Sequence, residues 1–95
     1  MTNHRIKLTK HAIERYAQRD ITKEQIKQVI NNPIETIHDN VRKNYKSFAL
    51  IEKPPFIGQP YLLVIHDGKF NTVVTVITVM WTDKGGLRAN GFSKL

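Results

Sequence analysis

The hydrophobic pattern of the chain changes near Pro33, from a helical spacing before this residue to a strand-like pattern after it. Residues 5–8 alternate polar and apolar side chains, which predicts a short first strand. Residues 11–19 carry apolar side chains one, three and four positions apart, which predicts a helix with one buried face. Thr9 offers the hydroxyl that would cap the free N–H groups at the start of this helix.

A second helix is predicted directly after a break near Asp20. Thr22 and Gln25 have the spacing of a capping box, in which each side chain satisfies the free backbone N–H of the other residue. Pro33 ends this helix, because proline disfavours the helical conformation of the residue before it. The side chains that we expect to be buried are Ile26, Val29 and Ile30.

The rest of the chain predicts antiparallel strands separated by turn residues, near residues 35–39, 45–51, 61–66 and 72–82. The last strand is nearly all β-branched or apolar, which is typical of a central strand covered on both faces. We therefore expect a single α+β domain over residues 1–95: a short N-terminal strand, two helices packed on one face, and a mostly antiparallel sheet. Residues 85–88 are expected to form a mobile basic end.

The charge of the chain suggests the kind of partner it binds. Fifteen Lys and Arg residues outnumber eight Asp and Glu residues, a formal charge of +7. Such an excess often indicates a negatively charged partner, most commonly nucleic acid, although it can also serve only solubility. The absence of cysteine excludes disulfides, cysteine zinc sites and a thiol nucleophile. No apolar stretch is long enough to span a bilayer and no signal region is recognisable, so we expect a cytoplasmic protein.

The most informative positions are His11, Arg15 and Arg19, which are spaced by four and would form one stripe on the first helix. Histidine can move a proton near neutral pH, and arginine can grip a phosphate and neutralise charge that grows in a transition state. This pattern suits RNA cleavage without a metal, since RNA carries its own nucleophile in the 2′-hydroxyl. The alternative is a solvated basic helix face with a surface histidine.

Further basic residues could hold flanking phosphates, with Tyr45 as a platform on which a base stacks. The alternative for Tyr45 is a ring that packs on the sheet of an exposed hairpin. No pair of histidines has the local spacing of a metal site and no phosphate-binding glycine loop occurs, so we expect neither a metal nor a cofactor. The basic residues expected to contact RNA are Lys10, Arg42, Lys43, Lys46, Lys84 and Arg88.

Three residues of the sheet have simpler expected roles. Trp81 is more typical of a core residue than of a ligand platform, and His66 is expected to border a turn. Thr75 and Thr78 are expected on opposite faces of the last strand, because side chains three positions apart on a regular strand point to opposite sides.

The opening of the chain resembles a bacterial family of small proteins related to the RelE-like and BrnT-like toxins. The residues that carry the resemblance are Thr9, His11, Ala12, Arg15, Arg19 and Ile21, then Asn32-Pro33, and Val73-Val74-Thr75-Val76 in the last strand. The resemblance covers roughly residues 5–82. It implies a RelE-like fold and a metal-independent endoribonuclease, and it adds Thr75 to the catalytic candidates because such toxins draw residues from the sheet.

Together these features suggest a metal-independent endoribonuclease, the toxin of a toxin–antitoxin pair. His11 would act as general base or acid, and Arg15 and Arg19 would stabilise the scissile phosphate. RNA is then the expected partner, and an acidic antitoxin could cover the same surface by charge complementarity. Two other functions stay open: a non-catalytic nucleic-acid-binding module, and a protein-interaction domain with a basic face. The sequence does not give the oligomeric state.

Overall fold

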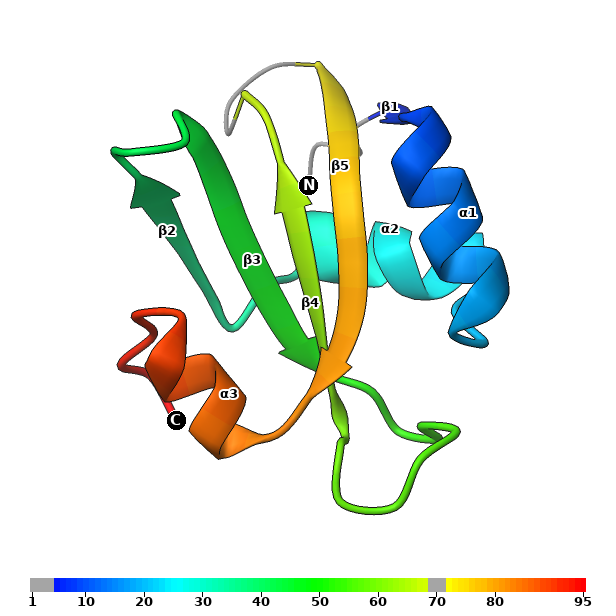
Figure 1. The fold of residues 1–95 in the computed structure, drawn as a ribbon, viewed down its shortest axis with the longest axis vertical. Helices are drawn as coiled ribbons and strands as arrows, with labels where there is room; N and C mark the ends of the chain where they lie inside the picture. Colours follow the sequence, from blue (N-terminus) through cyan, green and yellow to red (C-terminus); the bar gives the residue numbers. More distant parts are fainter. Residues whose placement is uncertain (1–4, 69–71) are drawn as a thin grey trace.

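A computed structural model describes residues 5–68 and 72–95 of the chain (Figure 1). His4 and Lys69, which the sequence marks as a titratable side chain and a turn residue, lie outside the described residues. The elements follow the predicted order of strand, two helices and strands, and a third helix is added at the end. They are β1 (Arg5–Leu8), α1 (Lys10–Gln18), α2 (Lys23–Asn31), β2 (Glu35–Asp39), β3 (Asn44–Leu50), β4 (Tyr61–His66), β5 (Val73–Thr82) and α3 (Lys84–Ala89).

The five strands form one sheet in the order β1-β5-β4-β3-β2. β2, β3, β4 and β5 pair antiparallel as a meander, whereas β1 pairs parallel with the first half of β5. The predicted α+β architecture with a mostly antiparallel sheet is therefore confirmed. β5 is central over that first half, as its β-branched sequence predicts, because it lies between β1 and β4.

The local signals that start the two predicted helices are confirmed. Thr9 accepts a hydrogen bond from the Ala12 N–H at 3.1 Å. Thr22 and Gln25 form both hydrogen bonds of the capping box, at 2.9 and 3.1 Å. Between the helices Asp20 has a φ of 52°, a left-handed conformation that ends the first helix and lets the chain turn sharply into the second.

The larger core lies between the sheet and the pair α1 and α2. Ala12 of α1 and the three predicted residues of α2, Ile26, Val29 and Ile30, are buried in it. They pack against alternate residues of β3, β4 and β5, because side chains two apart on a strand share a face. Trp81 belongs to this core with 8% of its surface exposed, which confirms its expected core position.

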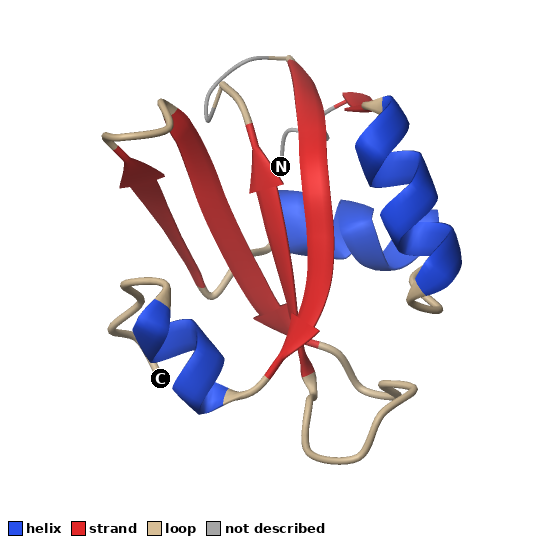
Figure 2. Cartoon of the chain, in the orientation of Figure 1, coloured by secondary structure: helices blue, strands red, loops and turns tan. Residues whose placement is uncertain are grey.

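The predicted mobile basic end is wrong, whereas the two predicted helices do pack on one face of the sheet. Residues 84–89 form α3, which lies on the opposite side of the sheet from α1 and α2 (Figure 2). The Asp83 side chain caps this helix by accepting the Gly86 N–H at 2.8 Å. Leu87 is fully buried against Phe48 and Leu63, in a second core that Phe92 completes. Burial of these side chains outweighs the low helix propensity of two glycines.

The C-terminal segment is tied to the edge strand β2 through Glu35. The Glu35 carboxylate accepts hydrogen bonds from the Lys94 N–H at 2.7 Å, the Ser93 N–H at 2.9 Å and the Ser93 hydroxyl at 3.2 Å. Desolvation by burial would raise the pKa of Glu35, but the hydrogen bonds from Lys94 and Ser93 stabilise the carboxylate and hold its pKa below the ordinary value.

Candidate functional site

Helix α1 runs along the edge of β5 that β1 leaves unpaired. β1 pairs with β5 only as far as Val76, so the carbonyl groups of the following residues need other donors. Thr9 supplies two, from its N–H to the Val76 oxygen and from its hydroxyl to the Ile77 oxygen, both at 3.1 Å. Arg19 supplies a third, from Nη1 to the Val79 oxygen at 2.8 Å. The contact between α1 and β5 is therefore held at both ends of the helix.

The residues His11, Arg15 and Arg19 lie along this contact, and we call them the α1 stripe. Arg19 is half-buried, and it is held by its backbone as well as by its side chain, since the Trp81 Nε1–H donates to its carbonyl oxygen at 2.7 Å. One Nη1–H of its guanidinium is thus committed to β5. A guanidinium has five N–H donors, so the remaining ones are available to a ligand.

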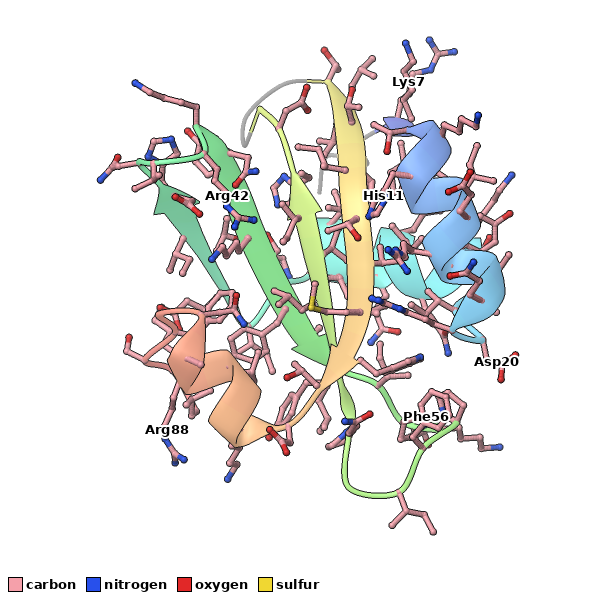
Figure 3. The ribbon with its side chains drawn as sticks, in the orientation of Figure 1. Lys7, His11, Asp20, Arg42, Phe56 and Arg88 are labelled. Carbon is pink, nitrogen blue, oxygen red and sulfur yellow. The ribbon has the colours of Figure 1, made fainter. Side chains whose placement is uncertain are left out.

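His11, which is labelled in Figure 3, is the exposed residue of the α1 stripe, and Arg15 is half-buried like Arg19. His11 is exposed, and its Nε2 accepts a hydrogen bond from the Arg15 Nε–H at 3.4 Å. Arg15 also donates from Nη1 to the Gln18 side chain at 3.4 Å. Because arginine can only donate, this contact uses Nε2 as the acceptor, which is the role that a general base needs. The spacing by four thus places a proton acceptor beside a cation, as the sequence suggests.

Thr75 lies away from this arrangement. The prediction that Thr75 and Thr78 point to opposite faces is wrong, because a bulge in β5 shifts the register: Ile65 pairs with Thr78, but His66 pairs with Val76. Both threonines consequently share the face on which α3 lies. The Thr75 N–H donates to the Asp67 carboxylate at 2.8 Å. Across the described residues no hydrogen bond joins Thr75 to the α1 stripe, and its catalytic role stays a prediction.

Tyr45 and Lys46 do not share a surface, because neighbours on a strand point to opposite faces. The Tyr45 ring lies between two imidazoles, with ring centroids 4.8 Å from His38 and 6.0 Å from His66. On the other face the Lys46 ammonium contacts the Asp39 carboxylate at 3.6 Å and the Asn90 side-chain oxygen at 3.3 Å. Tyr45 and Lys46 therefore lie on opposite faces of the sheet, and the prediction that they bind the base and the phosphate of one RNA segment together is not supported.

The remaining basic candidates are exposed but spread over separate corners of the molecule. Arg42 and Lys43 lie in the turn between β2 and β3, where hydrogen bonds from the Arg42 and Val41 N–H groups lower the pKa of Asp39. Lys84 and Arg88 lie on α3, and Figure 3 shows Arg88 on the other side of β5 from His11. Together with Lys10 on α1 they spread positive charge over the surface, but they do not converge on the α1 stripe.

A buried chain of hydroxyl and imidazole groups was not recognisable in the sequence. His66 has only 3% of its surface exposed, and its Nδ1 lies 2.9 Å from the Asp67 carbonyl oxygen while its Nε2 lies 2.7 Å from the Ser47 hydroxyl. The Ser47 oxygen lies 2.7 Å from the Thr36 hydroxyl. His66 does border the turn after β4, as expected. Its burial makes this chain a structural network, because a substrate cannot reach the Ser47 oxygen in this conformation.

Within residues 5–68 and 72–95, no three His, Asp or Glu side chains come together as a metal ion would require. None of the helices in the described part of the chain has the length and apolar character needed to cross a membrane.

Comparison with known proteins places the chain in a family. No curated protein and no solved structure shows a significant match to the chain. A family described as a domain of unknown function, DUF4258, matches residues 8–81, which include α1, α2 and nearly all of the sheet up to Trp81. Because this match extends over most of the chain, the protein belongs to the DUF4258 family.

Proposed function

We propose that this protein is a metal-independent endoribonuclease, the toxin of a toxin–antitoxin pair, which cleaves RNA through attack of a 2′-hydroxyl on the adjacent phosphate. The observation that carries the proposal is the pair on α1 in which the exposed His11 accepts, at Nε2, the Nε–H of the half-buried Arg15 at 3.4 Å. The resemblance to the RelE-like and BrnT-like toxins and the formal charge of +7 support it.

The reaction needs a base, an acid and a cation at the phosphate. His11 Nε2 takes the proton of the 2′-hydroxyl, and the 2′-oxygen then forms a bond to phosphorus. Arg15 turns its N–H groups from the imidazole to the non-bridging oxygens and offsets the charge that grows on them. The bond from phosphorus to the 5′-oxygen breaks, and the imidazolium returns its proton to that oxygen. The products are a 2′,3′-cyclic phosphate and a 5′-hydroxyl.

The test compares the wild type with His11→Ala and Glu14→Gln on mixed cellular RNA in EDTA. Glu14 is the matched control, because it is an exposed residue of the same helix and has no assigned role in binding or in the chemistry. We expect the wild type and Glu14→Gln to produce cyclic phosphate ends and His11→Ala to lose at least about 100-fold in rate, the lower range for a general base. Equal cleavage by all three would remove His11 from the reaction. Intact RNA with all three, on naked RNA and on translating ribosomes alike, would refute the endoribonuclease.

The second candidate is a non-catalytic RNA-binding module, and two observations favour it. His11 is the one imidazole among the described residues of α1, so no separate acid accompanies the base. Arg19, the other cation of the stripe, already donates to the Val79 oxygen. A binding module would lose RNA affinity with Arg15→Ala, and the slope of its binding constant against salt would fall by about one per lost phosphate contact, while His11→Ala would bind normally.

An acidic protein is the third partner to consider, either as an antitoxin or as the main ligand of an interaction domain. Opposite net charges would speed its association with this chain. An interaction domain would show no measurable RNA affinity at moderate salt. An antitoxin would instead compete with RNA for the α1 stripe, and Arg15→Ala would weaken both complexes.

A further inference from the structure

A hollow of about 330 Å³ lies at the end of the α1 stripe, beside the loop between β3 and β4. Its lining comes from three separate parts of the chain: the end of α1, the loop, and the last third of β5. The lining residues are Arg19, Phe56, Gln59, Met80 and Trp81. Figure 3 shows Phe56 beyond the lower end of α1, on the side of the molecule that carries His11.

The loop that carries Phe56 and Gln59 is fixed by its own backbone. Its base is closed by a hydrogen bond from the Ile51 N–H to the Pro60 oxygen at 2.9 Å. Its tip is a turn in which the Gln59 N–H approaches the Phe56 oxygen at 3.4 Å. Gly58 has a φ of 85° in this turn, a conformation that favours glycine. The turn holds Phe56 and Gln59 at its two ends, both against the hollow, and leaves Ile57 fully exposed to solvent.

The chemistry of the lining fits a planar ring with polar edges. Phe56 is 44% exposed and offers a flat ring on which a base can stack, and Trp81, which keeps 8% of its surface exposed, borders the hollow beside it. The Gln59 amide carries donors and an acceptor that can match a base edge. One Arg19 N–H donates to the Val79 oxygen of β5, and the other guanidinium N–H groups can bind a phosphate attached to the ring in the hollow.

We propose that this hollow binds one unstacked nucleobase of RNA and thereby selects the nucleotide next to the phosphate at Arg15 and His11. The inference rests on the proposed function for the position of the substrate. Arg19 follows Arg15 by four residues, about 6 Å along a helix axis, a separation that one nucleotide spans. The phosphate backbone follows the α1 stripe, and the flanking base turns into the hollow.

The chain contains a single tryptophan and this residue lines the hollow, so the fluorescence of the folded protein responds to a ligand bound there. The probe is a short RNA with 2′-fluoro groups, which lacks the nucleophile and cannot be cleaved. A matched series replaces one base at a time with an abasic residue and keeps every phosphate. We expect the intact probe to quench Trp81, and one abasic position to weaken binding about 5- to 100-fold and to abolish the quenching.

Two variants separate the hollow from the rest of the loop. Phe56→Ala removes a lining ring, and we expect it to bind intact and abasic probes with the same affinity. Ile57→Ala is the matched control, because this neighbour is fully exposed and outside the hollow, and it should retain the preference for the intact probe. The abasic series on the wild type needs no variant, so a folding defect in Phe56→Ala would not obscure the answer.

The proposal is overturned if every abasic probe binds as tightly as the intact one and leaves Trp81 fluorescence unchanged. Failure of the proposed function would look different. An abasic-sensitive, quenching complex with no cleavage of unmodified RNA would support the hollow and refute the nuclease. No binding of any probe at low salt would overturn both.

Discussion

Substitution of Arg19 should lower the stability of the protein, whereas the same substitution of Arg15 should leave it nearly unchanged. Arg19→Gln removes the hydrogen bond of 2.8 Å from a guanidinium to the Val79 carbonyl, in a half-buried position at the sheet edge. A hydrogen bond from a charged donor contributes about 1.5–3 kcal/mol, and the carbonyl would lose its donor. We therefore expect Arg19→Gln to lower the free energy of unfolding by about 2 kcal/mol. Arg15→Gln breaks only long, exposed contacts at 3.4 Å and should change it by about 0.5 kcal/mol or less.

Urea unfolding followed by Trp81 fluorescence measures this difference. Trp81 donates to the backbone oxygen of residue 19, which the substitution retains, so the probe keeps its environment in the folded variant. For a domain of this size, 2 kcal/mol corresponds to a fall in melting temperature of about 8–16 °C. Arg15→Gln should melt with the wild type and yet bind RNA more weakly, with a salt slope lower by about one.

Equal unfolding midpoints for Arg19→Gln and the wild type would refute the argument that this guanidinium stabilises the free edge of β5. A larger loss of stability in Arg15→Gln than in Arg19→Gln would refute the separation of the two roles.

Three further predictions concern helix α3 and the C-terminal segment that Glu35 holds. Leu87→Ala should lower the free energy of unfolding by about 2–5 kcal/mol in urea, since Leu87 is fully buried, and a change below about 1 kcal/mol would show that α3 contributes little. Gly86→Ala should lower the melting temperature, because a Cβ there would meet the buried Thr82 side chain. Gly85 is exposed, so Gly85→Ala should raise the melting temperature through the higher helix propensity of alanine, and the same shift in both variants would contradict this packing. The folded protein lowers the pKa of Glu35, so the Glu35 carboxylate stabilises the fold at pH values above its ordinary pKa of 4.5 and loses this contribution as the pH falls through the lower folded pKa. In Glu35→Gln the free energy of unfolding should therefore depend less on pH in this range, and an unchanged pH profile would contradict the prediction.

Local patterns in the amino-acid sequence predict the helices and strands correctly over most of the chain. Helix α1 begins one residue before the predicted start, and β3 is displaced by one residue from its predicted range. These elements are readable because their signals are local: a capping hydroxyl, an apolar spacing, or a proline. Each signal acts within a few residues of the backbone group that it satisfies.

Whether the C-terminal residues are mobile or helical depends on long-range packing, which the local sequence pattern does not show. Gly85 and Gly86 predict a mobile end, but Leu87 finds Phe48 and Leu63, which lie far away in the sequence. A helix of six residues has too few internal hydrogen bonds to stand alone, so its stability comes from that distant surface. The bulge in β5 is decided in the same way, by the register with β4 that places Thr75 and Thr78 on one face.

The candidate site shows the same distinction between features set by local sequence and features set by long-range packing. The sequence determined that His11 and Arg15 are neighbours, because residues four apart on one helix meet whatever else the chain does. Tertiary structure alone decided that Arg19 also serves the edge of β5, that Tyr45 and Lys46 lie on opposite faces, and that Phe56 and Gln59 join Trp81 around one hollow. These contacts depend on how far-separated segments pack and pair, which a local pattern along one chain does not encode.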